Sequence, residues 1–458
     1  MTKASSQKAS RRQFLRQGGR WAAAAAAPYL IPGGVLAAGG LPGANDRIGL
    51  AGIGIGRQGS GDLARAVASK LVHFVAVADV NLPRAKQIAK KYGGHACQNY
   101  RELLDRKDID AVITATPDHW RAIVCIHCCQ SGKDVYAEKP LSLTIHEGRQ
   151  MVAAARKYQR IFQVGSQQRS MAVNRAACAY VREGKLGKIT EVVAHNYPSP
   201  WQCALPAQPV PAGLDWNRWC GPTPLVSYNA DLYAPRGRPG WISFRPYSGG
   251  EMTGWGAHGL DQVQWALGMD DSGPVEVWTE GPRFDPPTYS APESLDRGDR
   301  LCSVPTVFFR YACGIVMKLT TGREGGAVFL GEKGKIDLSR DNVKSNPKGI
   351  AEEITAGLHR GRNAEMAHMR NWLECIKTRA KPVADVEIGH RSATVCHLGN
   401  IARWSGRRLR WDPVAEAFPD DAEANQLLDR PRRKPYGLPA VWDLGPPLPP
   451  GEGRGEGD

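Results

Sequence analysis

Two parts of this 458-residue chain contain residue types suited to moving protons. His258 and Asp261 are three positions apart in a segment expected to be helical, so their side chains share one face of the helix. The imidazole of His258 can accept a hydroxyl proton near neutral pH. Lys139 can stabilise an oxygen on which negative charge develops. The two groups suit oxidation of a secondary alcohol, in which a base takes the hydroxyl proton and hydride leaves the carbon for a cofactor.

A glycine-rich turn predicts where that cofactor binds. The apolar run 47–53 leads into Gly54-x-Gly56-x-x-Gly59, with Arg57 inside the turn, while Gly52-x-Gly54 offers a second register that lacks the third glycine. Residues without a Cβ allow a tight turn and let backbone N–H groups approach a pyrophosphate. The sequence therefore predicts a dinucleotide at this turn.

The identity of the dinucleotide follows from the next apolar run. Residues 71–78 end in Asp79, whose carboxylate can accept hydrogen bonds from an adenosine ribose and repels a 2′-phosphate. NAD is the predicted cofactor. Arg84 leaves NADP open.

Strands and helices alternate around these residues. We predict strands at 47–53, 71–78, 110–116 and 134–137, and helices at 61–69, 83–91 and 119–130. This alternation indicates a parallel sheet with helices on both faces. The loops after the last two strands carry Thr116-Pro117-Asp118-His119 and Glu138-Lys139-Pro140. Both loops should point toward the nicotinamide end of the cofactor, since ligands bind at the carboxyl ends of such strands.

Asp79, the Thr-Pro-Asp-His loop and above all Glu138-Lys139-Pro140 resemble the Gfo/Idh/MocA family of oxidoreductases, over about residues 47–413. Asp215-Trp216 and Trp411-Asp412-Pro413 resemble an exported branch of it that is abundant in planctomycete-like bacteria. The resemblance implies an α/β protein with an N-terminal Rossmann domain and a C-terminal α/β domain with an open, mainly antiparallel sheet. It also implies sugars, cyclitols or their derivatives as substrates.

The resemblance assigns roles to individual residues. Lys139 matches the catalytic lysine of the family's Glu-Lys-Pro motif, and His258 matches the histidine of its Gly-x-His-x-x-Asp segment. Typical dehydrogenases of the family carry an Asp four residues before that histidine, where this chain has Gly254. Glu251 and Asp261 are the two alternatives for that carboxylate. Gln167, Trp255 and Asp261 complete the predicted substrate contacts, with Lys139 and His258; the predicted cofactor contacts are Gly52, Gly54, Gly56, Arg57, Gly59, Asp79, Thr116, Pro117, His119, Glu138 and Lys139.

The remaining elements predict a second domain. We expect helices at 143–158, 171–183, 363–377 and 391–405, and strands at 161–165, 188–196, 302–310, 315–320, 327–330 and 335–338. The Pro-, Gly- and Trp-rich segment 198–250 is too long for a simple connection, so it either shapes a substrate site or contacts another subunit. We place the Rossmann domain at 45–165, a substrate-binding and oligomerisation domain at 166–415, and a partly disordered extension at 416–458. A homo-oligomer through the C-terminal sheet is expected from the resemblance.

The first 38 residues predict export. Arg11-Arg12 with Phe14-Leu15 precedes an alanine-rich apolar stretch, as in a twin-arginine signal, which addresses proteins that leave the cytoplasm folded. A periplasmic protein could then carry a cofactor bound before export. Beyond this segment we expect no stable membrane insertion.

The distribution of charged residues and of cysteines argues against a nucleic-acid-binding protein and against a metal site. The net charge is +15, but the cations are scattered apart from short clusters such as Arg430 to Lys434, which argues against nucleic-acid binding. Cys125, Cys128 and Cys129 lie in one expected helix without a second Cys/His pair, so we predict buried thiols and no metal.

Three functions remain open from the sequence. The first is an NAD(P)-dependent oxidoreductase of a sugar, cyclitol or related polyol. The second is a glycoside-cleaving enzyme that oxidises transiently, eliminates and re-reduces, which the glycine at position 254 favours. The third is a sugar-binding protein that keeps its cofactor without turnover.

Overall fold

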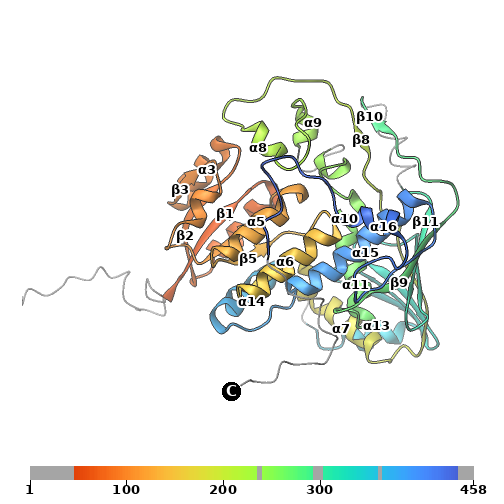
Figure 1. Cartoon of the computed structure of the whole chain (residues 1–458). Helices are drawn as coiled ribbons and strands as arrows, with labels where there is room; N and C mark the ends of the chain where they lie inside the picture. The colour runs from red at the N-terminus through yellow and green to blue at the C-terminus, as the bar shows by residue number, and fades with distance from the viewer. Residues whose placement is uncertain (1–45, 235–239, 292–302, 359–363, 442–458) are drawn as a thin grey trace, which may run out of the picture. The chain divides into compact units, whose positions relative to one another are not determined.

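The computed structural model contains a six-stranded parallel sheet (Figure 1). Five of its strands lie at the apolar runs predicted at 47–53, 71–78, 110–116, 134–137 and 161–165, and one short strand was not predicted. The structure describes residues 46–234, 240–291, 303–358 and 364–441, so the predicted export signal at 1–38 lies outside the described residues. The strand order is β3-β2-β1-β4-β5-β6. The strands are β1 (Ile48–Ile53), β2 (Val72–Ala78), β3 (His95–Cys97), β4 (Ala111–Thr114), β5 (Asp134–Ala137) and β6 (Phe162–Val164).

Helices cover both faces of this sheet. One face packs against α2 (Arg57–Val67), α3 (Leu82–Tyr92) and α14 (Ala364–Thr378). The other packs against α4 (Arg101–Leu104), α5 (Asp118–Gln130), α6 (Ile145–Lys157) and part of α15 (Val386–Ser405). The α/β class and the parallel sheet are confirmed, and α14 and α15 show that late parts of the chain complete the Rossmann core.

The helix after the glycine turn begins earlier than predicted. We expected it at 61–69, whereas α2 starts at Arg57 and includes Gly59 and Gly61. Glycine is a poor helix former in isolation. Here Gly59 allows close packing, because a Cβ on it would lie 2.9 Å from the Cβ of Ala115. Tertiary packing therefore overrides the local preference.

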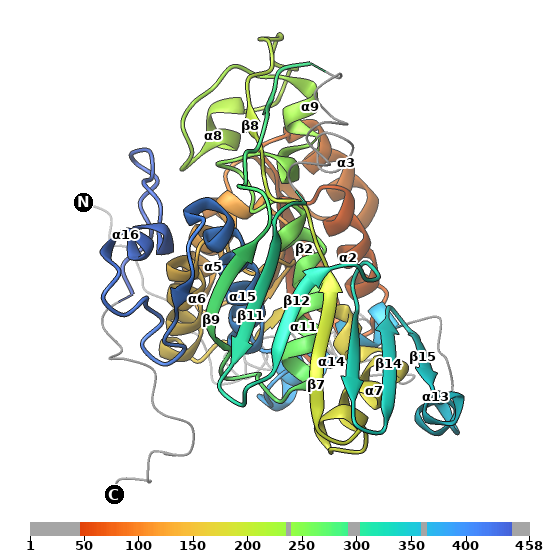
Figure 2. The same cartoon turned by 90° about the vertical axis from the view of Figure 1, so that its right-hand side faces the viewer.

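The second sheet has eight strands in the order β15-β14-β13-β7-β12-β11-β9-β16 and is antiparallel except for the β7–β12 pair (Figure 2). Val192, Phe309 and Leu319 belong to the core between this sheet and the helices α7 (Ala172–Arg182), α11 (Gly256–Ala266) and α15. The mainly antiparallel C-terminal sheet is thus confirmed, although the predictions missed β9, β15 and β16. Its strands are β7 (Ile189–His195), β9 (Pro274–Glu280), β11 (Thr306–Tyr311), β12 (Val316–Thr320), β13 (Ala327–Gly331), β14 (Gly334–Ser339), β15 (Asn342–Asn346) and β16 (Leu409–Arg410).

Residues 198–234 and 240–250, which we call the aromatic insert, form a small core of their own. Trp216 and Trp219 stack with ring centroids 4.4 Å apart, and Tyr228, Tyr247 and other aromatic residues pack around them. The insert contains β8 (Gln202–Cys203), which pairs with β10 (Thr288–Tyr289), and the short helices α8 (Trp216–Cys220) and α9 (Ala230–Tyr233). The helix α10 (Glu251–Gly254) follows directly.

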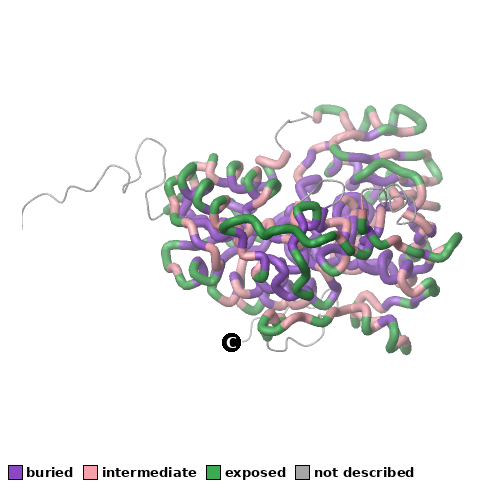
Figure 3. The backbone as a smooth tube through the Cα atoms, turned by 90° about the horizontal axis from the view of Figure 1, so that it is seen from above, coloured by how far each residue is buried: buried purple, intermediate pink, exposed green. Residues whose placement is uncertain are grey.

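The end of the described chain folds back onto the Rossmann side. After α13 (Lys348–Thr355), α14 and α15, the chain forms β16 and α16 (Ala422–Asn425) and continues to residue 441. Tyr436, Leu438 and Val441 pack against the core that contains α5 and α6. The predicted extension is therefore ordered over 416–441, and 442–458 lies outside the described residues. Figure 3 shows that buried residues fill the interior between these elements.

None of the helices in the described ranges has the length and apolar character needed to cross a membrane. The three neighbouring cysteines of α5 are buried in the Rossmann core. Burial raises the pKa of Cys128 to about 12, so this thiol stays protonated at neutral pH.

Candidate functional site

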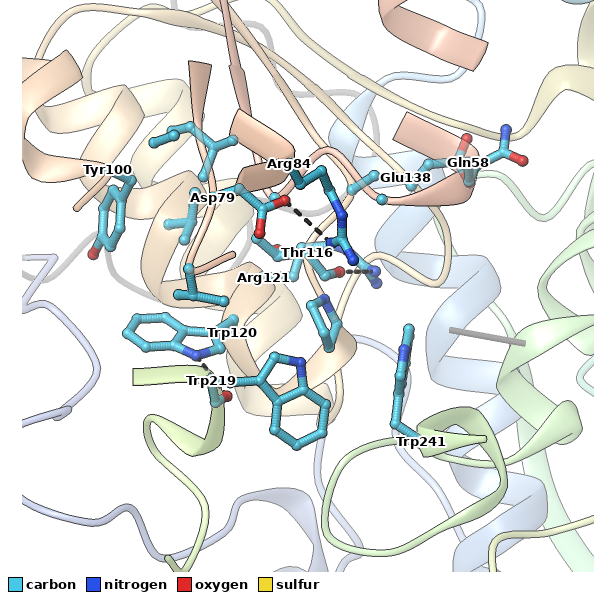
Figure 4. Close-up of a pocket in the computed structure, with 18 of the residues that line it drawn as sticks. Gln58, Asp79, Arg84, Tyr100, Thr116, Trp120, Arg121, Glu138, Trp219 and Trp241 are labelled. Atoms are coloured by element: carbon cyan, nitrogen blue, oxygen red, sulfur yellow. Dashed lines mark hydrogen bonds and ion pairs between the residues drawn. The ribbon is translucent and has the colours of Figure 1, made fainter. Parts of the chain in front are cut away.

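A cavity of about 290 Å³ lies between the carboxyl ends of the Rossmann strands and the aromatic insert. Gly54, Asp79, Thr116 and Lys139 reach it from the segments that follow β1, β2, β4 and β5. In Figure 4, Trp219 and Trp241 from the insert face the residues of the Rossmann side. Ligands of parallel α/β sheets bind at this edge, so the location fits the predicted dinucleotide.

The glycine turn has the backbone geometry that a phosphate cradle needs. Gly54 has φ of +66°, a conformation that other residues adopt only with strain, and a Cβ there would lie 2.5 Å from Cγ2 of Thr116. Gly56 has an extended backbone, and a Cβ on it would meet only the Arg84 guanidinium, 3.9 Å away. The turn is therefore tight at Gly54 and leaves room at Gly56, which lines the cavity.

The start of α2 is suited to an anion. Gly56 precedes the helix without a side-chain cap, and the first turn of α2 contains no acidic residue. The first N–H groups of a helix have no partners within the helix and carry partial positive charge. Among the described residues that line the cavity, five are cationic and two acidic: Arg57, Arg84, Arg121, Lys139 and Arg218 against Asp79 and Glu138. The donor set therefore fits a dinucleotide pyrophosphate.

Asp79 lies at the end of β2 with its side chain almost fully buried. One carboxylate oxygen accepts the Asn81 N–H at 2.9 Å, and the other is 3.3 Å from Nη1 of Arg84. Nη2 of Arg84 donates to the Tyr233 hydroxyl of the insert at 2.8 Å. Burial raises the pKa of Asp79, and the Arg84 charge and the Asn81 N–H oppose that rise.

Lys139 stands beside a buried carboxyl group. Glu138 is buried and accepts a hydrogen bond from Nε2 of Gln167 at 2.7 Å and one from the Lys139 N–H at 3.2 Å. Burial raises the pKa of Glu138, while the Lys139 charge acts in the opposite direction. Lys139 itself is partly exposed and lines the cavity. Its side chain thus lines the cavity at the end of β5, next to a fixed carboxyl group.

Arg121 ties the two predicted nicotinamide loops together, a role that the sequence predictions missed. Its buried guanidinium donates to the carbonyl oxygens of Thr116 and Pro140, the first at 2.6 Å, and pairs with Asp118 at 3.0 Å. Asp118 in turn accepts the Ser248 hydroxyl of the insert at 2.8 Å. The i, i+3 spacing of Asp118 and Arg121 was the available signal.

Three predicted contact residues hold other protein groups instead of lining the cavity. Nε2 of His119 donates to the Trp219 carbonyl at 2.9 Å, and burial lowers the pKa of His119 to about 3. Gln167 binds Glu138 and so positions it. Asp261 is buried in an ion pair with Arg169 at 2.8 Å and accepts the Ser392 hydroxyl at 2.6 Å. Each side chain thus has a protein partner in the structure, and contacts of these three residues with cofactor or substrate stay a prediction.

The histidine segment lies outside the cavity lining. His258 is buried on α11, its ring tilted against Trp255 with centroids 5.8 Å apart. Gly254 ends α10, and Glu251 at the start of α10 accepts the Trp255 N–H at 3.2 Å. Of the two carboxylates named as replacements for the family Asp, Asp261 is bound to Arg169.

Apart from His119, the predicted cofactor residues fall into two groups. Gly52 and Gly59 shape the turn from inside the fold, where a Cβ on Gly52 would lie 2.7 Å from Ile55. The predicted residues that line the cavity are Gly54, Gly56, Arg57, Asp79, Thr116, Pro117, Glu138 and Lys139. The lining residues that the predictions missed include Gln58, Gln98, Tyr100, Trp120, Arg218, Tyr233 and Ile242. Three of these, Arg218, Tyr233 and Ile242, come from the insert, and the local sequence carries no signal for such long-range contacts.

Comparison with protein families gives two matches that together cover most of the described chain. Residues 47–166 match the family model described as "Oxidoreductase family, NAD-binding Rossmann fold". Residues 185–438 match the model described as "Oxidoreductase family, C-terminal alpha/beta domain". Both models carry the Gfo/Idh/MocA name.

Curated relatives match over short stretches. A glycosyl hydrolase family 109 protein of Shewanella pealeana is 34% identical over 123 residues, which are 24% of this chain and 26% of the relative. A levoglucosan dehydrogenase of Pseudarthrobacter phenanthrenivorans is 30% identical over 114 residues, 25% of this chain and 29% of the relative. The chain thus matches little more than a quarter of the length of these relatives.

Solved structures share the fold at low identity. An aldose-aldose oxidoreductase from Caulobacter crescentus aligns with a TM-score of 0.55 at 18% identity, over 80% of this chain and 99% of that one. The WlbA dehydrogenase from Bordetella pertussis, in complex with NADH and UDP-GlcNAcA, aligns with a TM-score of 0.58 at 19% identity, over 80% and 98%. A levoglucosan dehydrogenase in complex with NADH and levoglucosan aligns with a TM-score of 0.56 at 17% identity, over 80% of this chain and 99% of that one.

Proposed function

The chain belongs to the Gfo/Idh/MocA family of oxidoreductases, and on that premise we propose that it transfers hydride between a tightly held NAD and a sugar, cyclitol or related polyol. The observation that carries the proposal is the cavity at the carboxyl edge of the Rossmann sheet, where Gly56, Asp79 and Lys139 meet. The relatives named levoglucosan dehydrogenase and aldose-aldose oxidoreductase support a carbohydrate substrate.

The cofactor would be held by groups that the site already presents. The N–H groups at the start of α2 and Arg57 would bind the pyrophosphate. Asp79 would accept hydrogen bonds from the adenosine ribose, its position fixed by Asn81 and Arg84. When bound, a nicotinamide supplies the acceptor or donor of hydride, chemistry that no side chain offers.

Lys139 is one of two catalytic residues in this proposal. Its ammonium would hydrogen-bond the substrate hydroxyl and stabilise the oxygen as negative charge develops on it. Glu138, held by Gln167, keeps a carboxyl group next to this lysine, and Arg121 fixes the loop carbonyls of Thr116 and Pro140 on either side. These contacts restrict the position of Lys139 before substrate arrives.

His258 is proposed as the group that takes the hydroxyl proton. The support is its place in the Gly-x-His-x-x-Asp segment and the proton affinity of an imidazole. Asp261 would act as a positioning residue, because its ion pair with Arg169 anchors the same helix, α11.

The ribose site gives a prediction about cofactor choice. We expect Asp79→Ser to lower the ratio of the Kd for NADPH to the Kd for NADH by at least about tenfold. The substitution removes a carboxylate that repels a 2′-phosphate, and it releases Arg84 to pair with that phosphate. Fluorescence titration with both reduced cofactors measures the ratio. Asp108→Ser is the matched control, because it breaks a similar Asp–Arg pair, that with Arg106, outside the cavity. An unchanged ratio in Asp79→Ser would remove Asp79 from the ribose site.

A second candidate function is glycoside cleavage by transient oxidation, elimination and re-reduction. The glycosyl hydrolase family 109 relatives favour it, as does Gly254 in place of the family Asp. The two functions differ in their products, since cleavage releases a sugar without accumulation of reduced cofactor.

One experiment separates the candidates. The purified protein is incubated with anhydrosugars, aldoses, cyclitols and N-acetylhexosaminides, while absorbance of reduced nicotinamide and release of free sugar are followed together. Reduced cofactor that forms with one substrate class supports the oxidoreductase. Sugar release without it supports cleavage. The absence of both with every class would leave the non-catalytic sugar-binding protein.

We also propose a homo-oligomer through the outer face of the eight-stranded sheet. Phe308 and Trp278 stack there with centroids 5.2 Å apart, on the face opposite Val307 and Phe309, which belong to the core. Val193 and Val316 alternate with core residues in the same way and are only half-buried. The ion pairs Lys318–Glu191 and Arg310–Glu276 lie on the same face, so this face combines apolar and charged residues, a combination suited to a second copy of the sheet.

Export to the periplasm by the twin-arginine route remains a proposal that rests on residues 1–38. Replacement of both Arg11 and Arg12 by lysine should keep the protein in the cytoplasm. Fractionation of cells that produce the full chain tests this, and unchanged export of the double variant would contradict it.

A further inference from the structure

One wall of the cavity depends on a helix that is too short to be stable alone. α8 has five residues, and it contributes Arg218 and Trp219 to the cavity lining. Isolated helices of this length do not persist in water, and the carbonyl groups at a helix C-terminus lack partners within the helix. Other parts of the protein must therefore hold α8 in place.

The Rossmann helix α5 provides part of this support. Nε1 of Trp120 donates to the carbonyl oxygens of Arg218 and Trp219, at 2.8 Å and 3.1 Å. Nε2 of His119 also donates to the Trp219 carbonyl. Gly221, which ends α8 with φ of +50°, packs so closely on the Trp120 ring that a Cβ would lie 2.3 Å away.

Further support comes from the end of the described chain. Arg433 donates through Nε to the carbonyl oxygens of Gly221 and Thr223, at 2.9 Å and 3.1 Å. Its two terminal nitrogens bind the side-chain and backbone oxygens of Asn217, at 2.7 Å and 2.8 Å. A guanidinium at a helix C-terminus is favoured by both its charge and its fork of donors. Arg433 thus binds carbonyl groups at the carboxyl end of α8 other than those that α5 binds.

The segment that carries Arg433 is itself fastened to the Rossmann side. Nε of Arg430 donates to Glu147 of α6 at 2.9 Å, and its Nη2 donates to the His119 carbonyl at 2.7 Å. Arg432 also pairs with Glu147, at 3.0 Å. The Tyr436 ring meets the Trp120 ring edge-on, with centroids 5.3 Å apart. We call residues 429–441 the C-terminal strap.

We propose that the C-terminal strap retains the bound dinucleotide by clamping α8 against α5, with Arg433 as the positioning residue. The inference deepens the proposed function and rests on it. The dinucleotide leaves only when the wall that holds Arg218 and Trp219 moves away from the Rossmann edge. That movement breaks the contacts of Arg433 with Asn217 and Gly221, so these contacts set the rate of release.

The test compares the dissociation rate of NADH in the full-length chain and its variants. Stopped-flow fluorescence follows loss of NADH after mixing with excess NAD. We expect Arg433→Ala to raise the dissociation rate constant by about tenfold, since several hydrogen bonds to a charged group are lost. Arg433→Lys should give a smaller rise, because it keeps the charge but not the fork of donors. Arg407→Ala is the matched control, as it removes an arginine that pairs with Asp421 and Glu423 and does not touch α8.

A second variant and a second measurement distinguish loss of the strap contacts from a general loss of stability. Tyr436→Leu weakens the strap at Trp120 and also removes the ring that the Arg433 guanidinium covers at 5.1 Å, so it should also speed release. Hydrogen exchange should accelerate at the α8 amides in Arg433→Ala and stay unchanged in β1 and α15. Both variants should melt within a few degrees of the wild type, because the contacts lie at the surface of the Rossmann core.

The results distinguish a failure of the strap proposal from a failure of the proposed function. Rapid release in Arg433→Ala and Tyr436→Leu, with slow release in Arg407→Ala, supports the strap. If the wild type binds NADH and Arg433→Ala releases it at the wild-type rate, the strap proposal is overturned and the proposed function stands. If the wild type binds no nicotinamide dinucleotide, the proposed function fails and the strap proposal fails with it.

Discussion

Gly56→Asp is expected to weaken NADH binding at least about a hundredfold while the protein remains folded. Gly56 has an extended backbone that any residue can adopt, and a Cβ there meets only the Arg84 guanidinium at 3.9 Å. Aspartate is also a favourable residue at a helix N-cap, so the free energy of unfolding should change by less than about 1 kcal/mol. Its carboxylate, however, would occupy the space of the pyrophosphate and repel it.

A fluorescence titration with NADH and a thermal melt measure the two effects. Ser60→Asp is the control, because it adds the same charge to an exposed position of α2 that does not line the cavity. We expect this variant to bind NADH nearly as the wild type does. Equal affinity in Gly56→Asp and the wild type would place the pyrophosphate elsewhere.

Lys139→Met is expected to lower kcat about a thousandfold, with the Kd for NADH changed by less than about tenfold. Methionine keeps much of the length of the side chain but removes the charge that would stabilise the substrate oxygen. The loss of that charge also lets the pKa of Glu138 rise further, because Lys139 now opposes the effect of burial on this carboxyl group. Single-turnover kinetics with the substrate found in the activity screen measures the chemical step apart from binding.

Lys86→Met serves as the control for Lys139. It removes an exposed lysine of α3 that does not line the cavity, and it should retain full activity. A Lys139→Met protein with wild-type kcat would show that the lysine is not catalytic. In that case His258 or a group of the insert would have to stabilise the substrate oxygen.

The Rossmann half of the fold was predictable because its signals are local. Apolar runs such as 71–78 end at polar residues, and in β2 the run leads directly to Asp79. The family motif at Glu138-Lys139-Pro140 also lies within one strand end and one loop. Each of these features depends on neighbours in sequence, so pattern and spacing were enough to place Asp79 and Lys139 at the edge that forms the cavity.

The parts that the sequence did not predict depend on distant contacts. The aromatic insert closes the cavity through Trp219 and Tyr233, and its position is fixed by α5 and by Arg433, more than 200 residues further along the chain. The short cationic cluster at Arg430–Lys434 had no predicted role, although three of its arginines make specific contacts. Asp261 was expected at the substrate, yet the partner that binds it, Arg169, lies 92 positions away.

The proposed function and the strap proposal both require one nicotinamide dinucleotide bound at the glycine turn between β1 and α2. Native mass spectrometry of the purified wild type, incubated with NAD or NADH, tests this most directly and also counts subunits. We predict the mass of one dinucleotide per chain in the wild type and its loss in Gly56→Asp. A wild-type protein that shows only the mass of the bare chain after both incubations would contradict the account.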